Sequence, residues 1–153
     1  MAGMSPPSGQ RIAFVQSTWH EAIVDRCRAS FADEVVKLGT PRDLVDFYTV
    51  PGSFELPLHA KQLALLGKYS AVVAAGLVVD GGIYRHEFVA EAVINGLMRV
   101  QLDLDVPIIS VVLTPHHFHE HEQHALFFAS HFELKGREAA RACTSTVRSL
   151  AAL

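Results

Sequence analysis

The chain has 153 residues, of which 50% are hydrophobic and 19% charged, and its formal net charge is -3. This size fits one domain with a sizeable core, and no cluster of lysine or arginine indicates binding of nucleic acid. No apolar run is long enough to cross a bilayer, and residues 1–10 lack the apolar segment of a signal peptide. We therefore expect a cytoplasmic protein with a flexible tail over 1–10, one domain over 11–153, and an apolar surface that contacts other subunits.

The first half of the chain predicts strands and helices in alternation. Residues 11–16 form a short apolar strand, and cap-type residues from Ser17 precede a helix that ends at Gly39. A second strand over 44–50 ends at the Pro51-Gly52 turn, and a helix over 54–66 follows. The apolar face of the first helix recurs at every fourth residue: Ile23, Cys27, Phe31 and Val35.

The second half continues this order. The apolar run over 71–79 is typical of a central parallel strand, a helix begins near Ile83, and Pro107 introduces another strand over 107–113. Thr114 and Pro115 predict the start of a helix through a histidine-rich segment, and residues 134–150 predict a separate last helix. Together these elements predict an α/β fold, a flavodoxin-like three-layer α/β/α sandwich around a four-stranded parallel sheet.

Three segments should meet at the carboxyl ends of the strands and outline one pocket: 17–20, 51–55 and 80–86. Trp19, the only tryptophan, can stack on a planar heterocycle, or it is a half-buried core aromatic. Ser53 can cap the following helix, and Glu55 suits the positive end of the helix dipole. Capping alone would explain these two residues.

The turn at Asp80-Gly81-Gly82 leads from a buried strand into a helix, an arrangement that exposes backbone N–H groups to a phosphate. Many such turns bind no ligand. Arg85 and His86 follow in the first helical turn, where they can supply a cation and a proton donor or acceptor. Solvated surface residues are the alternative interpretation.

The histidine-rich segment over 116–124 has the spacing of a metal site, because His117 and His121 lie four residues apart and His124 continues that face. It lacks the flanking pattern of a metalloenzyme, so we favour a polar helix with pH-sensitive charge and predict no metal. Cys27 and Cys143 lack metal-type spacing and predict reduced, buried thiols.

The motif Pro51-Gly52-Ser53-Phe54-Glu55-Leu56-Pro57 resembles the lumazine synthase family. The resemblance extends through residues 76–82, 85–89, 110–114 and 135–140, and so covers essentially the whole chain in the right order. It implies condensation of 5-amino-6-(ribitylamino)uracil with 3,4-dihydroxy-2-butanone 4-phosphate to 6,7-dimethyl-8-ribityllumazine. It also implies that these small-molecule substrates react without a cofactor.

Residue roles follow from this resemblance by position. Trp19 would stack on the pyrimidine, and the ribityl chain would contact Ser53, Phe54 and Glu55. The remaining substrate-binding positions are the backbone of Leu77, Val78 and Val79, the turn at Gly82 and Ile83, and Ser110. The phosphate would bind at Gly82, Ile83, His124 and Lys135.

Two departures from the family pattern concern the catalytic groups. Arg85 occupies the place of the family's usual histidine and His86 follows one position later, so either residue can be the proton-transfer group. His124 stands where the family has a phosphate-binding arginine, which would make phosphate affinity pH-dependent. Both departures resemble the branch of the family that forms decamers from two pentamers.

Two other functions are alternatives to the predicted synthase. A lumazine- or riboflavin-binding protein would keep the pocket and have weak or lost synthase activity, as the residues at positions 85 and 124 could indicate. A metal-binding or hydrolytic domain centred on the histidine-rich segment is the less favoured alternative.

Overall fold

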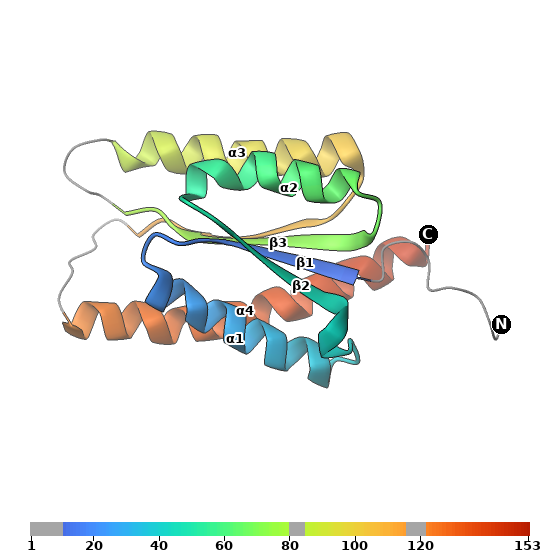
Figure 1. Cartoon of the computed structure of the whole chain (residues 1–153), viewed down its shortest axis with the longest axis horizontal. Helices are drawn as coiled ribbons and strands as arrows, with labels where there is room; N and C mark the ends of the chain where they lie inside the picture. Colours follow the sequence, from blue (N-terminus) through green and yellow to red (C-terminus); the bar gives the residue numbers. More distant parts are fainter. Residues whose placement is uncertain (1–10, 80–84, 116–121) are drawn as a thin grey trace.

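Strands and helices alternate along the chain in a computed structural model that describes residues 11–79, 85–115 and 122–153, without the side chains of 122–125. Short 3₁₀ turns at Arg42–Leu44 and Ser53–Glu55 precede β2 and α2. The element order, which Figure 1 shows, is β1 (Arg11–Ser17), α1 (Glu21–Lys37), β2 (Val45–Val50), α2 (Leu56–Leu65), β3 (Tyr69–Leu77), α3 (His86–Leu104), β4 (Ile108–Leu113) and α4 (Glu122–Ala151).

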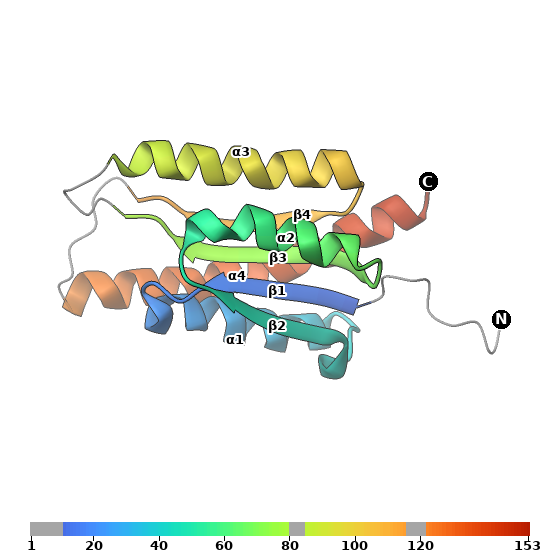
Figure 2. The same cartoon turned by 45° about the horizontal axis from the view of Figure 1, so that its top comes forward.

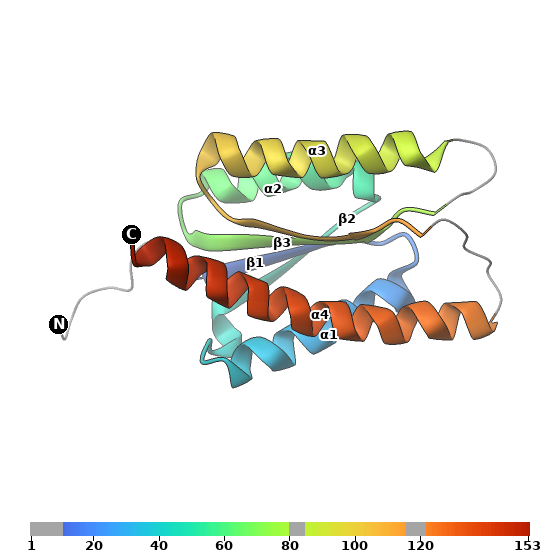
Figure 3. The ribbon, with the colours of Figure 1, turned by 180° about the vertical axis from the view of Figure 1, so that it is seen from behind.

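The four strands form one parallel sheet in the order β2-β1-β3-β4. Helices α2 and α3 cover one face of this sheet (Figure 2), and α1 and α4 lie side by side on the other (Figure 3). This arrangement confirms the predicted flavodoxin-like three-layer sandwich. Because all strands run the same way, their carboxyl ends share one edge of the sheet, where ligands of such folds bind.

Two apolar clusters fill the spaces between the sheet and its helices. Alternate residues of β1 point to opposite faces, so Ile12 and Phe14 pack towards α1 and α4 while Ala13 and Val15 pack towards α2 and α3. The fully buried rings of Phe14 and Phe31 lie with their centroids 5.1 Å apart. Burial of each such ring stabilises the fold by about 1.5–3 kcal/mol.

The start of α1 differs from the prediction of a cap from Ser17. Ser17 is the last residue of β1 and fully buried, and the helix begins after His20, whose side chain makes no capping hydrogen bond. Thr18 is used elsewhere, since its Oγ1 donates to the carbonyl of Pro51 at 3.2 Å. The predicted stop at Gly39 is confirmed, because Gly39 has a φ of 105° just beyond the end of the helix.

The last helix also differs from the prediction. Where we expected two helices, α4 runs without interruption for 30 residues from Glu122 to Ala151. The apolar stripe of Phe128, Phe132, Ala139 and Cys143 is continuous and packs on the α1 side of the sheet, which favours one long helix. Residues 116–121 lie outside the described residues, so the helix start expected at Thr114-Pro115 stays a prediction.

Cys27 and Cys143 are free and buried, as the sequence predicted. Loss of solvation raises the pKa of each thiol to about 12. Of the helices within the described ranges, none is both long enough and apolar enough to cross a membrane.

Candidate active site

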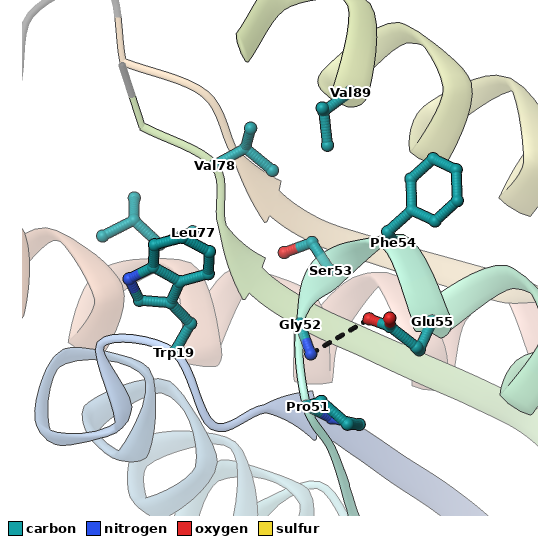
Figure 4. Close-up of a pocket in the computed structure, with 9 residues that line it drawn as sticks. All are labelled: Trp19, Pro51, Gly52, Ser53, Phe54, Glu55, Leu77, Val78 and Val89. Atoms are coloured by element: carbon teal, nitrogen blue, oxygen red, sulfur yellow. Dashed lines mark hydrogen bonds between the residues drawn. The ribbon is translucent and has the colours of Figure 1, made fainter. Parts of the chain in front are cut away.

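A cavity of about 370 Å³ opens at the carboxyl ends of β1, β2 and β3 (Figure 4). Its wall combines an aromatic ring from the β1 loop, the 3₁₀ turn after β2, the end of β3 and the first turns of α3. Nine described residues line it: Trp19, Pro51, Gly52, Ser53, Phe54, Glu55, Leu77, Val78 and Val89. The structure therefore brings together six of the predicted site residues, from three separate segments of the chain.

Trp19 reaches the cavity from the loop that follows β1. The preceding residue ties this loop to the end of β2, because the Thr18 N–H donates to the carbonyl of Val50 at 2.9 Å. Trp19 is 54% exposed, and its indole ring lies on the opposite side of Ser53 from the Phe54 ring (Figure 4). An aromatic face that is open to this extent is available for stacking on a planar ligand.

Glu55 makes a local capping hydrogen bond, the alternative explanation that the sequence left open. Its Oε2 accepts from the backbone N–H of Gly52 at 3.1 Å, which closes the turn between β2 and α2 (Figure 4). The carboxylate stays largely exposed at the cavity wall. Its second oxygen leaves capacity for a ligand hydroxyl, since an ionised carboxylate accepts several hydrogen bonds.

Ser53 does not cap the following helix, so that prediction is wrong. Its side chain is only 7% exposed, and among the described residues its Oγ has no hydrogen-bond partner. Gly76 explains how the hydroxyl fits, because a Cβ at that position would lie 2.4 Å from Ser53 Oγ and 3.1 Å from Ser17 Oγ. The cavity floor thus holds a buried hydroxyl with unused hydrogen-bonding capacity, which costs free energy unless a partner binds there.

The end of β3 contributes Leu77 and Val78 to the cavity, whereas Val79 is buried in the cluster that faces α1 and α4. The Val78 N–H donates to the carbonyl of Leu113 at 2.9 Å, which prolongs the contact between β3 and β4. This N–H is therefore already hydrogen-bonded within the sheet.

Arg85 and His86 stand at the start of α3, and neither is among the described residues that line the cavity. The Arg85 guanidinium is exposed and lies 5.7 Å from the centre of the Phe88 ring. The Nδ1 of His86 lies 3.3 Å from the Glu87 Oε2. Gly82 and Ile83, predicted to bind the phosphate, lie outside the described residues.

Ser110 and Lys135 both line a different hollow, of about 240 Å³, between β4 and α4. The Lys135 Nζ lies 3.0 Å from the Glu138 Oε2, which also lines this hollow. Because β4 is the edge strand, the hollow faces outward from the sheet. His124 belongs to the first turn of α4, and its side chain is outside the description.

Sequence reasoning missed Val89 as a cavity residue. Val89 packs against the apolar cluster on the α2 and α3 side of the sheet, and the wall of the cavity continues that apolar face. Within the described ranges, no group of three His, Cys, Asp or Glu side chains is arranged to hold a metal ion. His117 and His121, the residues of the predicted metal spacing, fall outside those ranges.

The fold places the chain in the class of flavodoxin-like α/β proteins, and its cavity lies where proteins of this class bind ligands, at the carboxyl ends of parallel strands. Comparison with known proteins is more specific. A model of the 6,7-dimethyl-8-ribityllumazine synthase family matches residues 9–151, and the chain belongs to this family.

Curated relatives agree with the family match over nearly the full chain. A 6,7-dimethyl-8-ribityllumazine synthase of Rhodococcus erythropolis is 67% identical over 98% of this chain and 97% of its own length. A protein named 6,7-dimethyl-8-ribityllumazine synthase 2 in Pseudomonas syringae pv. tomato is 53% identical over 94% of this chain and 85% of its own. A 6,7-dimethyl-8-ribityllumazine synthase 1 of Caulobacter vibrioides is 36% identical over 96% of this chain and 94% of its own.

Proposed function

We propose that this chain condenses 5-amino-6-(ribitylamino)uracil with 3,4-dihydroxy-2-butanone 4-phosphate to 6,7-dimethyl-8-ribityllumazine, a step of riboflavin biosynthesis. The strand-end cavity carries this proposal, because it unites an open indole, a buried hydroxyl and an exposed carboxylate: Trp19, Ser53 and Glu55. These groups suit a planar pyrimidine with a hydroxylated side chain. The relatives from Rhodococcus and Pseudomonas carry the name of this activity.

The reaction needs two small molecules held together more than it needs a reactive protein group. The pyrimidine amine attacks the ketone and loses water to form an imine, after which phosphate leaves and the product tautomerises to a new carbonyl. The ribityl-bearing amine then adds to that carbonyl and a second water departs, which closes the ring. Proximity and orientation of two bound reactants lower such barriers by roughly 7–11 kcal/mol in the best cases.

We assign the remaining two roles, proton transfer and phosphate binding, to His86 and Arg85 at the start of α3. We assign proton transfer to His86, because an imidazole can both donate and accept a proton near neutral pH, whereas a guanidinium stays charged. Arg85 then serves as the cation for the butanone phosphate.

Substitution of each residue tests these two roles. His86→Ala should lower kcat modestly, while Arg85→Ala should chiefly raise the KM for the butanone phosphate. Equal kinetics of both variants and the parent across pH would refute the assignment.

We also propose that a neighbouring copy of the chain completes the cavity. Ser110 and Lys135 line an outward-facing hollow of their own. In the cavity wall, Trp19 and Phe54 are 54% and 65% exposed, which leaves them available for contact with a second chain. A head-to-tail ring that brings the β4 edge of one subunit to the cavity of the next would unite the two groups. We infer pentamers of this kind that pair into decamers.

Mixed assemblies test this shared site. Trp19→Ala and Lys135→Ala assemblies should each have little activity, whereas assemblies that contain both variants should regain about a quarter of the parent's sites. The gain arises because some interfaces pair an intact cavity with an intact Lys135. No recovery in mixed assemblies, when each variant alone is well folded, would mean that both residues act within one chain.

We further infer a cytoplasmic location. Cys27 and Cys143 are free, buried thiols. Reduced cysteines of this kind are usual in the cytosol.

The direct test of the activity is to mix the purified protein with both substrates and to follow lumazine absorbance together with phosphate release. We expect one phosphate per lumazine at a rate well above that of the uncatalysed mixture. Turnover no faster than that mixture, with riboflavin still bound, would instead identify a lumazine- or riboflavin-binding protein.

A further inference from the structure

The turn between β1 and α1 contains a residue in an unfavourable backbone conformation. His20 has φ 57° and ψ 43°, the left-handed region that side chains with a Cβ rarely adopt. Its carbonyl accepts the first hydrogen bonds of α1, from Ile23 at 3.0 Å and Val24 at 3.1 Å. The imidazole makes no capping hydrogen bond in return, so helix capping does not account for the strained conformation.

This turn controls the position of the cavity's indole ring. Trp19 lies between two fixed points. On one side, Thr18 donates from its N–H to the carbonyl of Val50 at the end of β2 and from its Oγ1 to the carbonyl of Pro51 just beyond it. On the other side, His20 turns the chain into α1. The indole and imidazole rings are nearly parallel, at 18°, with centroids 6.1 Å apart. Because Trp19 is 54% exposed, packing against the core holds its ring only in part, and the backbone on either side must supply the rest.

We propose that His20 is a positioning residue that acts through its left-handed backbone and thereby holds the Trp19 ring over the cavity (Figure 4). A residue that resists this conformation shifts the turn towards other geometries, and the fraction of chains with the indole in place falls. Ligand affinity falls by the same factor. The inference rests on the proposed function only in its choice of a planar ligand.

The test is a series of substitutions at position 20, ranked by how readily each residue adopts the left-handed region. His20→Gly and His20→Asn should bind riboflavin within about twofold of the parent, because glycine and asparagine tolerate this conformation. His20→Ala and His20→Ser should be weaker, and His20→Val weakest, with a Kd about 5- to 30-fold higher. Serine separates conformation from capping, since it is a strong N-cap residue without a left-handed preference.

Trp19 itself gives the readout, because it is the only tryptophan in the sequence. Quenching of its fluorescence by riboflavin measures the Kd, and anisotropy with acrylamide quenching measures the freedom of the ring without any ligand. Asp105→Val is the matched control, since Asp105 has φ 56° just beyond the last residue of α3, whereas the cavity is lined by the first turn of that helix. It should lower stability as His20→Val does and leave the Trp19 signal unchanged.

Two results would overturn the inference. Equal losses in all five variants at position 20 would mean that the imidazole itself acts, and a series led by serine would mean that capping matters. Failure of the proposed function can be told apart from failure of this inference. If the parent binds no riboflavin, anisotropy and acrylamide quenching still measure the mobility of the Trp19 ring. In that case His20→Val must loosen the ring relative to His20→Gly, and equal ring mobility would refute the role of the turn.

Discussion

A small network of polar side chains ties three strands together at the edge of the sheet away from the cavity. The Asp46 carboxylate accepts from Arg11 Nη2 at 2.7 Å, from Arg11 Nε at 3.0 Å and from the Tyr69 hydroxyl at 2.7 Å. The hydrogen bond from Arg11 is the main reason that the pKa of Asp46 falls to about 2. Burial and the hydrogen bond with Tyr48 raise the pKa of Tyr69.

The lowered pKa of Asp46 predicts a pH-dependent contribution to stability. A carboxylate whose folded pKa lies below its unfolded value stabilises the fold fully above the unfolded pKa and loses that effect as pH falls towards 2. The difference in free energy of unfolding between the parent and Asp46→Asn should therefore shrink between pH 5 and pH 2, as urea titrations would measure. Asp33→Asn, at an exposed position of α1, is the control, and a difference for Asp46→Asn that is constant with pH would contradict this account.

Gly76 makes room for the buried hydroxyl of the cavity floor. In Gly76→Ala the new Cβ would meet Ser53 Oγ at 2.4 Å, so Ser53 must move, and we expect a loss of about 1–3 kcal/mol in stability and weaker ligand binding. Removal of that oxygen in the double variant Gly76→Ala with Ser53→Ala should restore part of the stability. Strictly additive losses in thermal or urea unfolding would show that the two positions do not compete for space.

At the scale of elements, the pairing of α1 with α4 depends on a close approach at Gly136. A Cβ there would lie 1.9 Å from Ser30 Oγ and 2.5 Å from the backbone oxygen of Cys27. Two ion pairs flank the contact, Arg26 with Glu133 at 2.7 Å and Arg141 with Glu34 at 3.3 Å. The backbone oxygen cannot move aside without moving α1.

Gly136→Ala should consequently destabilise the protein by about 2 kcal/mol or more, although this exchange usually stabilises a helix. Gly96→Ala in α3 is the matched control, because its Cβ would meet only side-chain atoms of Pro57, at 3.0 Å. Its loss of stability should be smaller in the same urea titration. If Gly136→Ala were the more stable of the two variants, the helices would not be as close as described.

The sequence allowed the order and type of the elements to be predicted because each strand is a short apolar run and each helix carries a regular apolar face. What failed were choices that depend on tertiary contacts. Thr18 bonds to the end of β2 instead of capping α1, and the apolar stripe of α4 continues past the expected break near Leu134. Neither contact is visible in local propensity.

At the scale of the whole molecule, α3 has a second apolar stripe that the sheet does not cover. Ile94, Met98 and Leu102 recur at every fourth residue and are 42%, 52% and 69% exposed. An exposed stripe of this kind suits contact with another copy of the chain.

A charge placed on this stripe tests the contact. Met98→Glu should reduce the mass measured by light scattering towards that of smaller assemblies or one chain, while Lys37→Glu on the other face of the sheet should not. An unchanged mass of Met98→Glu would exclude this face as an interface.

The candidate site was only partly predictable for a reason at this same scale. Trp19, Ser53 and Glu55 could be grouped because strand ends of a parallel sheet meet at one edge. Ser110 and Lys135 share another hollow in the single chain, and only family resemblance connects them to the cavity. No local sequence pattern around these two residues indicates that they belong to a site completed by a neighbouring subunit.

The central claim is that lumazine forms in the strand-end cavity, and kcat/KM of Glu55→Gln tests it most directly. Loss of a charged acceptor for the ribityl hydroxyls should lower kcat/KM about 10- to 100-fold, while the amide oxygen still accepts from Gly52 and preserves the turn. Glu133→Gln, which breaks an exposed ion pair between α1 and α4, should leave kcat/KM within about twofold of the parent. Equal kcat/KM for Glu55→Gln and the parent would contradict the assignment of this cavity as the active site.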